Sequence, residues 1–175
     1  MRIPRQYASL SILLLLLFNE KAAGQFRLDS WTTDNGLPQA SINSILQTRD
    51  GFLWFSTFGG LVRSDGLRFQ VFNTGNTKGL KTSRFLDLFE DREGALWVAN
   101  ELQGVTRYKD GVFTTYSTEH GLAVGLIQFR EDASGNLLAN LNTGRGNADF
   151  RWTGESFVPY APPEGEPARN ILYRT

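Results

Sequence analysis

Few side chains in this chain of 175 residues could perform chemistry, because it contains one histidine and no cysteine. The lack of cysteine removes thiol catalysis and cysteine-ligated metal sites from consideration. His120 lies in the segment Glu119-His120-Gly121-Leu122. No helical periodicity surrounds it, as a phosphoacceptor histidine would require, and a catalytic histidine would need a nucleophile and an orienting acid nearby. We interpret His120 as a loop residue.

Carboxylates are the second possible source of chemistry. None of them follows the alternating oxygen spacing of a calcium loop. A glycoside-cleaving pair would need two carboxyl groups on opposite sides of the scissile bond. Most of the acids instead occupy repeated turn positions, where turn formation already explains them. We therefore predict no catalytic residue, no metal site and no cofactor. The acids considered are Asp50, Asp65, Glu90, Asp91, Glu93, Asp110, Glu131 and Asp132.

An internal repeat indicates the elements that position these residues. The segment Arg49-Asp50-Gly51-Phe52-Leu53-Trp54 recurs as Arg92-Glu93-Gly94-Ala95-Leu96-Trp97, and more weakly as Ala133-Ser134-Gly135-Asn136-Leu137-Leu138. The three turn glycines are separated by 43 and then 41 residues. A period of about 40–45 residues, built from short strands and glycine turns, is typical of one four-stranded propeller blade.

Each unit opens with Gly-Leu and holds four short apolar strands, joined by tight turns in which glycine supplies a positive φ. The sequence therefore predicts an all-β fold of β-propeller blades, each a four-stranded antiparallel meander, with about three and a half blades in an incomplete ring. The units span about 36–72, 79–116 and 121–160. We expect Trp54 and Trp97 to pack between adjacent sheets rather than to form a ligand platform. The structural residues of the repeat are Gly51, Trp54, Gly66, Gly94, Trp97, Gly111, Gly135 and Gly154.

Both ends of the repeat array are incomplete. Residues 26–31 match the fourth strand of a unit and would close the last blade of a ring, whereas residues 168–175 start a further blade. In the degraded third unit, the Asn- and Gly-rich segment 140–148 predicts a long loop. Closed propellers have about 4–8 blades, so we expect this sequence to be a fragment of a longer protein.

The first 24 residues differ in composition from the rest. Arg2 and Arg5 precede the apolar run Leu10–Phe18, and Ala22-Ala23-Gly24 offers a cleavage site. This pattern predicts a signal peptide over 1–24, with residues 25–175 exported to the periplasmic or extracytoplasmic side of the envelope. A membrane-spanning helix would need about 20 apolar residues, so no span is expected. The 18 basic and 18 acidic side chains balance, which disfavours a nucleic-acid partner.

The first unit combines Gly36-Leu37-Pro38, Ser41-Ile42, Asp50–Thr57, Gly60–Arg63 and Asp65-Gly66. This pattern closely resembles the two-component regulator propeller repeat, and the resemblance extends in weakening form over residues 26 to about 160. It implies the sensor region of a transmembrane receptor with paired propellers, a β-sandwich, one transmembrane helix and a cytoplasmic output module such as a histidine kinase or a diguanylate cyclase. The implied partners are the remaining blades, the output module, a second receptor copy and a small-molecule or oligosaccharide ligand.

We expect longer second-to-third and fourth-to-first strand connections on one rim, opposite the short turns, and such loops are a natural recognition surface. The candidate ligand-binding residues on this rim are Asn100, Glu101, His120, Asn142 and Arg145. The sequence thus predicts a ligand-sensing propeller module without catalysis. Two alternatives stay open, namely a polysaccharide lyase or hydrolase on a propeller scaffold and a passive scaffold for protein interactions.

Overall fold

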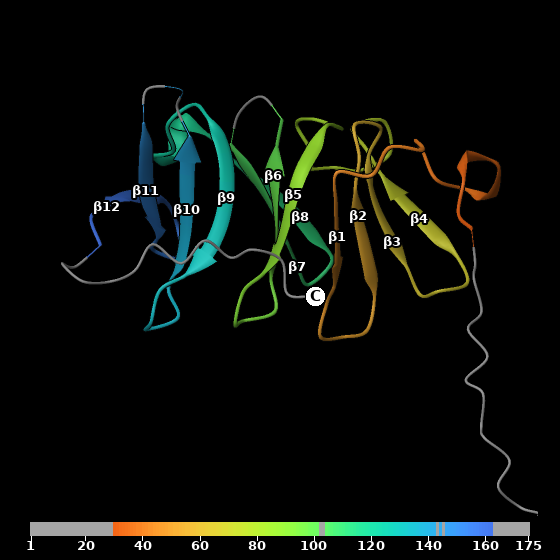
Figure 1. Cartoon of the computed structure of the whole chain (residues 1–175), viewed down its shortest axis with the longest axis horizontal. Helices are drawn as coiled ribbons and strands as arrows, with labels where there is room; N and C mark the ends of the chain where they lie inside the picture. Colours follow the sequence, from red (N-terminus) through yellow and green to blue (C-terminus); the bar gives the residue numbers. More distant parts are fainter. Residues whose placement is uncertain (1–29, 102–103, 143, 145, 163–175) are drawn as a thin grey trace, which may run out of the picture. The chain divides into compact units, whose positions relative to one another are not determined.

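The computed structural model describes residues 30–101, 104–142, 144 and 146–162 (Figure 1). The expected signal peptide, residues 26–29 of the expected closing strand and the expected further strand at 168–175 lie outside this part of the chain. Apart from two short 3₁₀ turns, η1 (Thr33–Asn35) and η2 (Thr118–His120), the regular elements described are β-strands. No helix in these ranges is long and apolar enough to cross a membrane.

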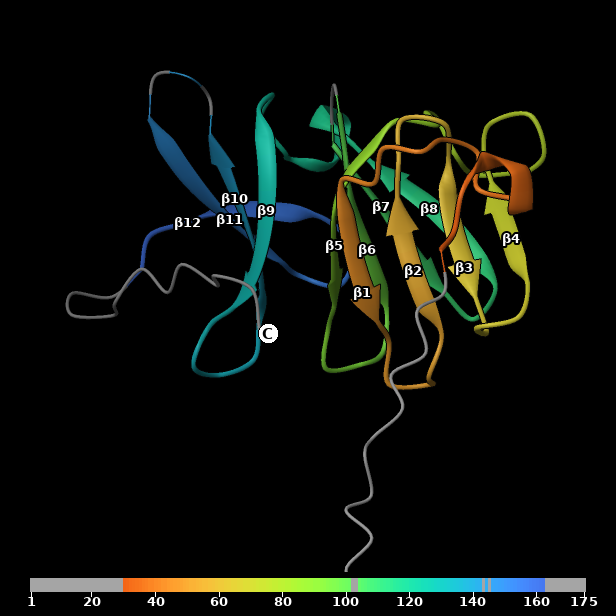
Figure 2. The same cartoon turned by 45° about the vertical axis from the view of Figure 1, so that its right-hand side comes forward.

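The strands form three antiparallel sheets of four strands, and in each sheet neighbouring strands follow one another along the chain (Figures 1 and 2). Blade 1 contains β1 (Ser44–Gln47), β2 (Leu53–Ser56), β3 (Leu61–Ser64) and β4 (Phe69–Phe72). Blade 2 contains β5 (Phe85–Glu90), β6 (Leu96–Asn100), β7 (Val105–Lys109) and β8 (Val112–Tyr116). Blade 3 contains β9 (Leu126–Glu131), β10 (Leu137–Asn142), β11 (Asn147–Trp152) and β12 (Phe157–Tyr160). The predicted architecture of propeller blades is confirmed.

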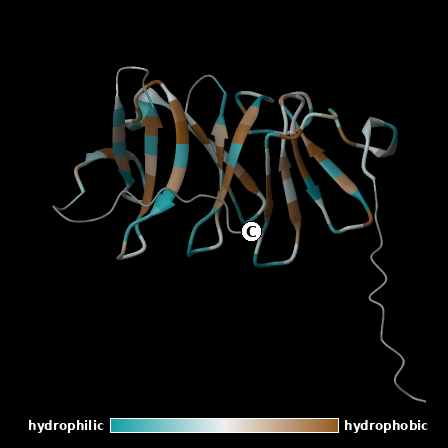
Figure 3. Ribbon diagram, viewed as in Figure 1, coloured by the Kyte–Doolittle hydropathy of each residue, from teal (hydrophilic) through white to brown (hydrophobic). Residues whose placement is uncertain are grey.

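The β5–β6 hairpin shows why the repeated turn sequence folds as it does. Gly94 has a φ of 76°, a left-handed conformation that residues with a Cβ rarely adopt. Asp91 is buried, and its carboxylate accepts hydrogen bonds from the Ala95 N–H at 2.8 Å and from the Trp97 indole Nε1 at 2.7 Å. One carboxylate therefore closes the turn and also orients the indole. The hydropathy colouring places apolar residues on the strands and polar residues at these turns (Figure 3).

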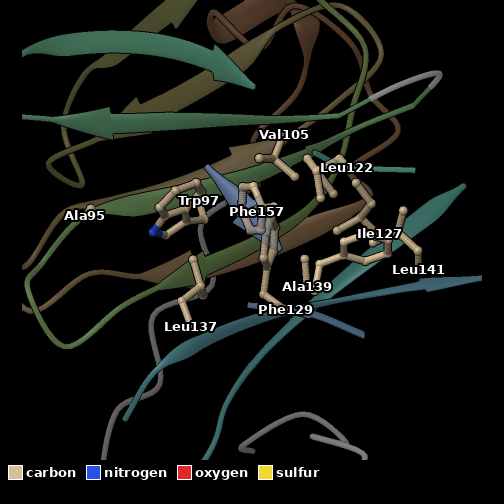
Figure 4. Close-up of a cluster of buried hydrophobic side chains, with 12 residues drawn as sticks. Ala95, Trp97, Val105, Leu122, Ile127, Phe129, Leu137, Ala139, Leu141 and Phe157 are labelled. Atoms are coloured by element: carbon tan, nitrogen blue, oxygen red, sulfur yellow. The ribbon is translucent and has the colours of Figure 1, made fainter. Parts of the chain in front are cut away.

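Two of the three buried hydrophobic clusters of the described residues lie between blades, because a single sheet has two faces and no interior. Trp54 of β2 is 2% exposed and belongs to a buried cluster that includes Leu88 of blade 2. Trp97 of β6 is fully buried and lies against Phe129 and Phe157 of blade 3, with ring centroids 6.3 and 5.7 Å away (Figure 4). Burying an aromatic side chain stabilises by about 4–6 kcal/mol, so each blade depends strongly on its neighbour.

A polar contact repeats at both seams between blades. The Nε and the backbone N–H of Arg49 in blade 1 donate to Glu90 of blade 2, with Nε at 3.1 Å from the carboxylate. Arg92 of blade 2 makes the same two contacts with Glu131 of blade 3, with Nε at 3.0 Å. Both arginine side chains are more than half exposed, so each pair is worth at most about 1 kcal/mol. The two pairs align the neighbouring turns. Blade 3 has Ala133 at the position that Arg49 and Arg92 occupy in blades 1 and 2.

Two expectations about the connections are wrong. The second-to-third strand connections are not longer than the other turns, because 57–60, 101–104 and 143–146 have four residues each. The segment 140–148 is therefore not a long loop, and its polar residues join the β10–β11 ladder instead. Asn140 faces Asp149 across the β10–β11 pair and donates to its carboxylate at 2.7 Å, and Leu141 is fully buried. Only the fourth-to-first connections, 73–84 and 117–125, are long.

The glycines that open the second and third units are required for a different reason from the turn glycines, because the backbone of the fourth strand lies against them. A Cβ added at Gly79 would lie 2.1 Å from the carbonyl oxygen of Phe113, and one at Gly121 would lie 2.0 Å from that of Phe157. The first glycine of a unit therefore packs on the fourth strand of the same unit. At the turn residue Gly66, by contrast, a Cβ would meet no atom within 4 Å.

Replacing Gly79 and Gly66 by alanine separates close packing from backbone strain, because their φ angles are nearly equal, at 94° and 89°. Gly66→Ala is expected to cost about 1–2 kcal/mol, the penalty of the left-handed conformation alone. Gly79→Ala adds a clash with a carbonyl group and is expected to cost at least about 3 kcal/mol more. Urea denaturation of the two variants measures the difference, and equal losses would contradict the close-approach explanation.

Candidate functional site

The candidate rim is the edge of each sheet at which the second strand ends and the third begins. In Figure 1 the β1–β2, β5–β6 and β9–β10 turns lie at the lower ends of the sheets, so β2, β6 and β10 end at the upper side. Asn100 and Asn142 are the last residues of β6 and β10, and His120 ends η2 in the connection between blades 2 and 3. Arg145 lies outside the described residues.

Asn100 and Glu101 have structural partners. Asn100 is 2% exposed, and its Oδ1 accepts a hydrogen bond from the Thr106 hydroxyl at 3.1 Å. Glu101 forms a bidentate ion pair with Arg84, and this hydrogen-bonded partner lowers the pKa of the Glu101 carboxyl. The Arg84 guanidinium also lies 4.2 Å from the centre of the Phe58 ring in the β2–β3 connection. The pair therefore ties the rim of blade 2 to the rim of blade 1.

His120 and Asn142 form local caps. The Nδ1 of His120 accepts the backbone N–H of Ser117 at 3.2 Å, and its ring packs edge-on against Tyr116. The Oδ1 of Asn142 accepts the N–H of Gly144 at 2.9 Å, and the residue is exposed. None of these contacts tests ligand binding, so the five candidates stay predictions. Asn142 is the described candidate whose side chain is most open to solvent.

The structure reveals an equivalence between Asn76 and His120 that sequence alignment missed. The Oδ1 of Asn76 accepts the N–H of Asn73 at 2.9 Å, just as His120 accepts that of Ser117. Asn73 and Ser117 each follow the last residue of a fourth strand, β4 or β8. The two connections differ in length, 73–84 and 117–125, which hides the match in the sequence. Both side chains end a fourth strand by satisfying its next backbone donor.

Asp87 is a partly buried carboxyl at the seam between blades 1 and 2. The pairing of β5 with β6 shifts between Phe85 and Leu88, and this irregularity contains Asp87. Its Oδ1 accepts the Ser44 hydroxyl of β1 at 3.2 Å and the Leu88 N–H at 2.9 Å. Burial raises the pKa of Asp87, because it disfavours the charged form more than these two hydrogen bonds favour it.

One hollow lies between the fourth strands of blades 1 and 2, β4 and β8, and none of the rim candidates lines it. Its volume is about 670 Å³, and it is wide open to solvent. The lining comes from β4, the connection after it and the start of β8, with Lys78 as its charged residue. In the part of the chain that the structure describes, no group of three or more His, Cys, Asp or Glu side chains could hold a metal ion.

Comparison with known proteins bears on the repeat. Residues 36–59 match the family model of the two component regulator propeller. Blade 1 carries a two component regulator propeller repeat. The match begins at the Gly-Leu that opens the first unit and ends within the β2–β3 connection, and it confirms the resemblance inferred from the sequence. No curated protein matches the chain.

Two solved structures are similar in fold to this chain. The extracellular domain of BT3049 from B. thetaiotaomicron, assigned to a hybrid two component system, aligns with a TM-score of 0.64 and 20% identity, over 79% of this chain and 19% of that one. The extracellular domain of BT4673, assigned likewise and from the same organism, aligns with a TM-score of 0.55 and 24% identity, over 70% of this chain and 19% of that one. The chain therefore spans about a fifth of the domains it matches.

The cap made by His120 can be tested with the residue that does the same work at position 76. His120→Ala is expected to lower the free energy of unfolding by about 1 kcal/mol relative to His120→Asn, because asparagine restores the acceptor for Ser117. Both variants lose the ring contact with Tyr116, so their difference isolates the hydrogen bond. Urea titrations supply the measurement, and indistinguishable variants would show that the cap contributes nothing.

Asp87→Asn is expected to stabilise the protein at neutral pH. The raised pKa means that the folded state holds a proton more tightly than the unfolded state, so stability contributed by Asp87 falls as pH rises from the ordinary aspartate value through the raised one. Asparagine keeps an acceptor for Ser44 and Leu88 and carries no charge. The gain should shrink as pH falls below the ordinary pKa. Thermal melts of both proteins across pH 3–8 test this, and a gain independent of pH would contradict it.

Proposed function

We propose that this chain contributes blades to the extracytoplasmic sensor propeller of a transmembrane signalling receptor. The observation that carries the proposal is the regulator propeller repeat at 36–59, set in a series of four-stranded blades. Extracellular domains assigned to hybrid two component systems share the fold, which supports an extracytoplasmic location. The output module, such as a histidine kinase or diguanylate cyclase, and the pairing of receptor copies are parts of the same proposal.

The ligand enters at the rim formed by the ends of the second strands. Glu101 and Asn142 offer it a carboxylate and an amide group, and Phe58 adds a partly buried aromatic ring beside Arg84. Amides, carboxylates and aromatic faces together suit a hydroxyl-rich ligand, so we propose an oligosaccharide. Binding rather than turnover is proposed, because the acids with assigned partners serve the fold. Asp91 holds an indole and Glu90 holds an arginine of the preceding blade.

A thermal-shift screen of the full chain against oligosaccharides tests the proposal. A ligand at 100 times its dissociation constant adds about 2.7 kcal/mol to the folded state, which corresponds to a rise in Tm of roughly 5–10 °C. Asn142→Ala is expected to reduce this rise. Leu67→Ala is the matched control, because Leu67 is 91% exposed in the β3–β4 turn, at the opposite end of the sheet.

Other results of the screen would point to other functions. No shift with any oligosaccharide, combined with capture of a defined protein partner, would favour a passive scaffold. Cleavage of a glycan by the purified chain would favour an enzyme, especially if one carboxylate substitution abolished it. A shift that Asn142→Ala and Leu67→Ala reduce equally would place the ligand away from the rim.

A further inference from the structure

The arginine of the third strand is repeated in blades 1 and 2, and its two copies take up the same position. Arg63 faces Trp54 across the β2–β3 pair, and its guanidinium carbon lies 5.8 Å from the centre of the indole ring. Arg107 faces Trp97 across the β6–β7 pair, and the corresponding distance is 5.7 Å. The surroundings of the two guanidinium groups can therefore be compared residue by residue.

The guanidinium of Arg63 has three partners at the seam between blades 1 and 2. Its Nη2 donates to the Oε1 of Gln70 on β4 at 2.8 Å, and its Nη1 donates to the Tyr108 hydroxyl on β7 at 3.3 Å. The ring of Phe52 covers it, with the ring centre 4.5 Å from the guanidinium carbon. Two acceptors and one aromatic face thus satisfy this arginine.

Two of these partners are replaced by smaller side chains around Arg107. Thr114 faces Arg107 across the β7–β8 pair, at the position that Gln70 occupies in blade 1. Ala95 directly follows the turn glycine, where blade 1 has Phe52. The amide acceptor and the covering ring are therefore both missing from blade 2.

The third partner, the tyrosine hydroxyl from the following blade, is replaced by a tryptophan. The ring centre of Trp152 lies 5.1 Å from that of Trp97, just as Tyr108 lies 5.1 Å from Trp54. A phenol oxygen can accept a hydrogen bond, whereas an indole N–H can only donate one. An acceptor has thus been exchanged for a donor beside Arg107.

Arg107 is consequently a partly buried guanidinium without a hydrogen-bond acceptor among the described residues. Its Nε is buried and has no hydrogen-bond partner. The indole N–H of Trp152 and the hydroxyl of Thr114 also donate to no residue in the described ranges. A positive charge flanked by two further donors is best satisfied by an oxyanion, which accepts hydrogen bonds from all three.

We propose that the seam between blades 2 and 3 binds an oxyanion at the third and fourth strands, namely the carboxylate, phosphate or sulfate group of a small ligand. The fork of Arg107 binds two of its oxygens. Thr114 donates from the same face of the sheet, since cross-strand neighbours share a face, and Trp152 donates from blade 3. Thr114 is exposed and the other two residues are partly exposed, so the anion enters from solvent. None of these residues is a rim candidate, so the site is independent of the proposed oligosaccharide.

An NMR titration of the full chain tests this site directly. Sodium acetate, phosphate and sulfate are added separately, with chloride holding the ionic strength constant, and the indole N–H signal of Trp152 is followed. At least one anion is expected to shift this signal saturably, and the anion that does so at the lowest concentration identifies the ligand group. Arg107→Gln should weaken this binding about tenfold or more, because it removes the charge-assisted hydrogen bonds. Arg63→Gln is the matched control and should leave binding unchanged, since Arg63 has its own acceptors.

A second variant keeps the arginine and gives it the acceptor that blade 1 has. Thr114→Gln places an amide opposite Arg107, as Gln70 lies opposite Arg63. Without added anion it is expected to raise Tm by roughly 1–3 °C, because the guanidinium gains an acceptor. It should also weaken anion binding, since the amide then competes for the same donors. The proposal is overturned if no anion gives a saturable shift, if Arg107→Gln and Arg63→Gln weaken binding equally, or if Thr114→Gln leaves binding unchanged.

Discussion

The burial of one tryptophan between successive sheets is the contact on which the rest of this structure depends. Trp54 and Trp97 each project from the second strand of a blade into a cluster shared with the next blade. A four-stranded sheet cannot bury its own faces, so without that contact blade 1 or blade 2 would expose a large apolar surface to water. Folding and blade order therefore follow from one requirement, which is that each indole finds the adjacent sheet.

Polar contacts then fix the alignment that hydrophobic burial leaves loose. The arginine that opens a first turn reaches the carboxylate at the end of the next blade's first strand, as Arg49 reaches Glu90 and Arg92 reaches Glu131. Because these pairs are exposed on the arginine side, they add little stability and mainly set how neighbouring turns lie against each other. Asp91 connects the polar turn to the hydrophobic core, since one carboxylate binds both the turn backbone and the Trp97 indole.

The repeat allowed the fold to be predicted because it places turn glycines and tryptophans at a period that is typical of four-stranded blades. Prediction failed where tertiary contacts decide. Composition suggested a loop at 140–148, but Asn140 and Asp149 extend the ladder by pairing with each other. The sequence did not reveal why Gly79 and Gly121 open their units, because only the fold brings a carbonyl of the fourth strand so close that no side chain fits there. Among the rim candidates, the cap made by His120 could not be read from type alone, because its equivalent is an asparagine.

These findings narrow where specificity can arise on such a scaffold. A side chain that occupies a repeated position, or that caps a strand as Asn76 and His120 do, is constrained by the fold and cannot vary freely with a ligand. The proposed recognition therefore rests on rim residues that do not occupy a repeated structural position. Asn142 meets this condition better than Asn100, which is buried and bonded to Thr106. Blade 3, the unit that departs most from the repeat, is therefore the one in which this chain has most room for its own chemistry.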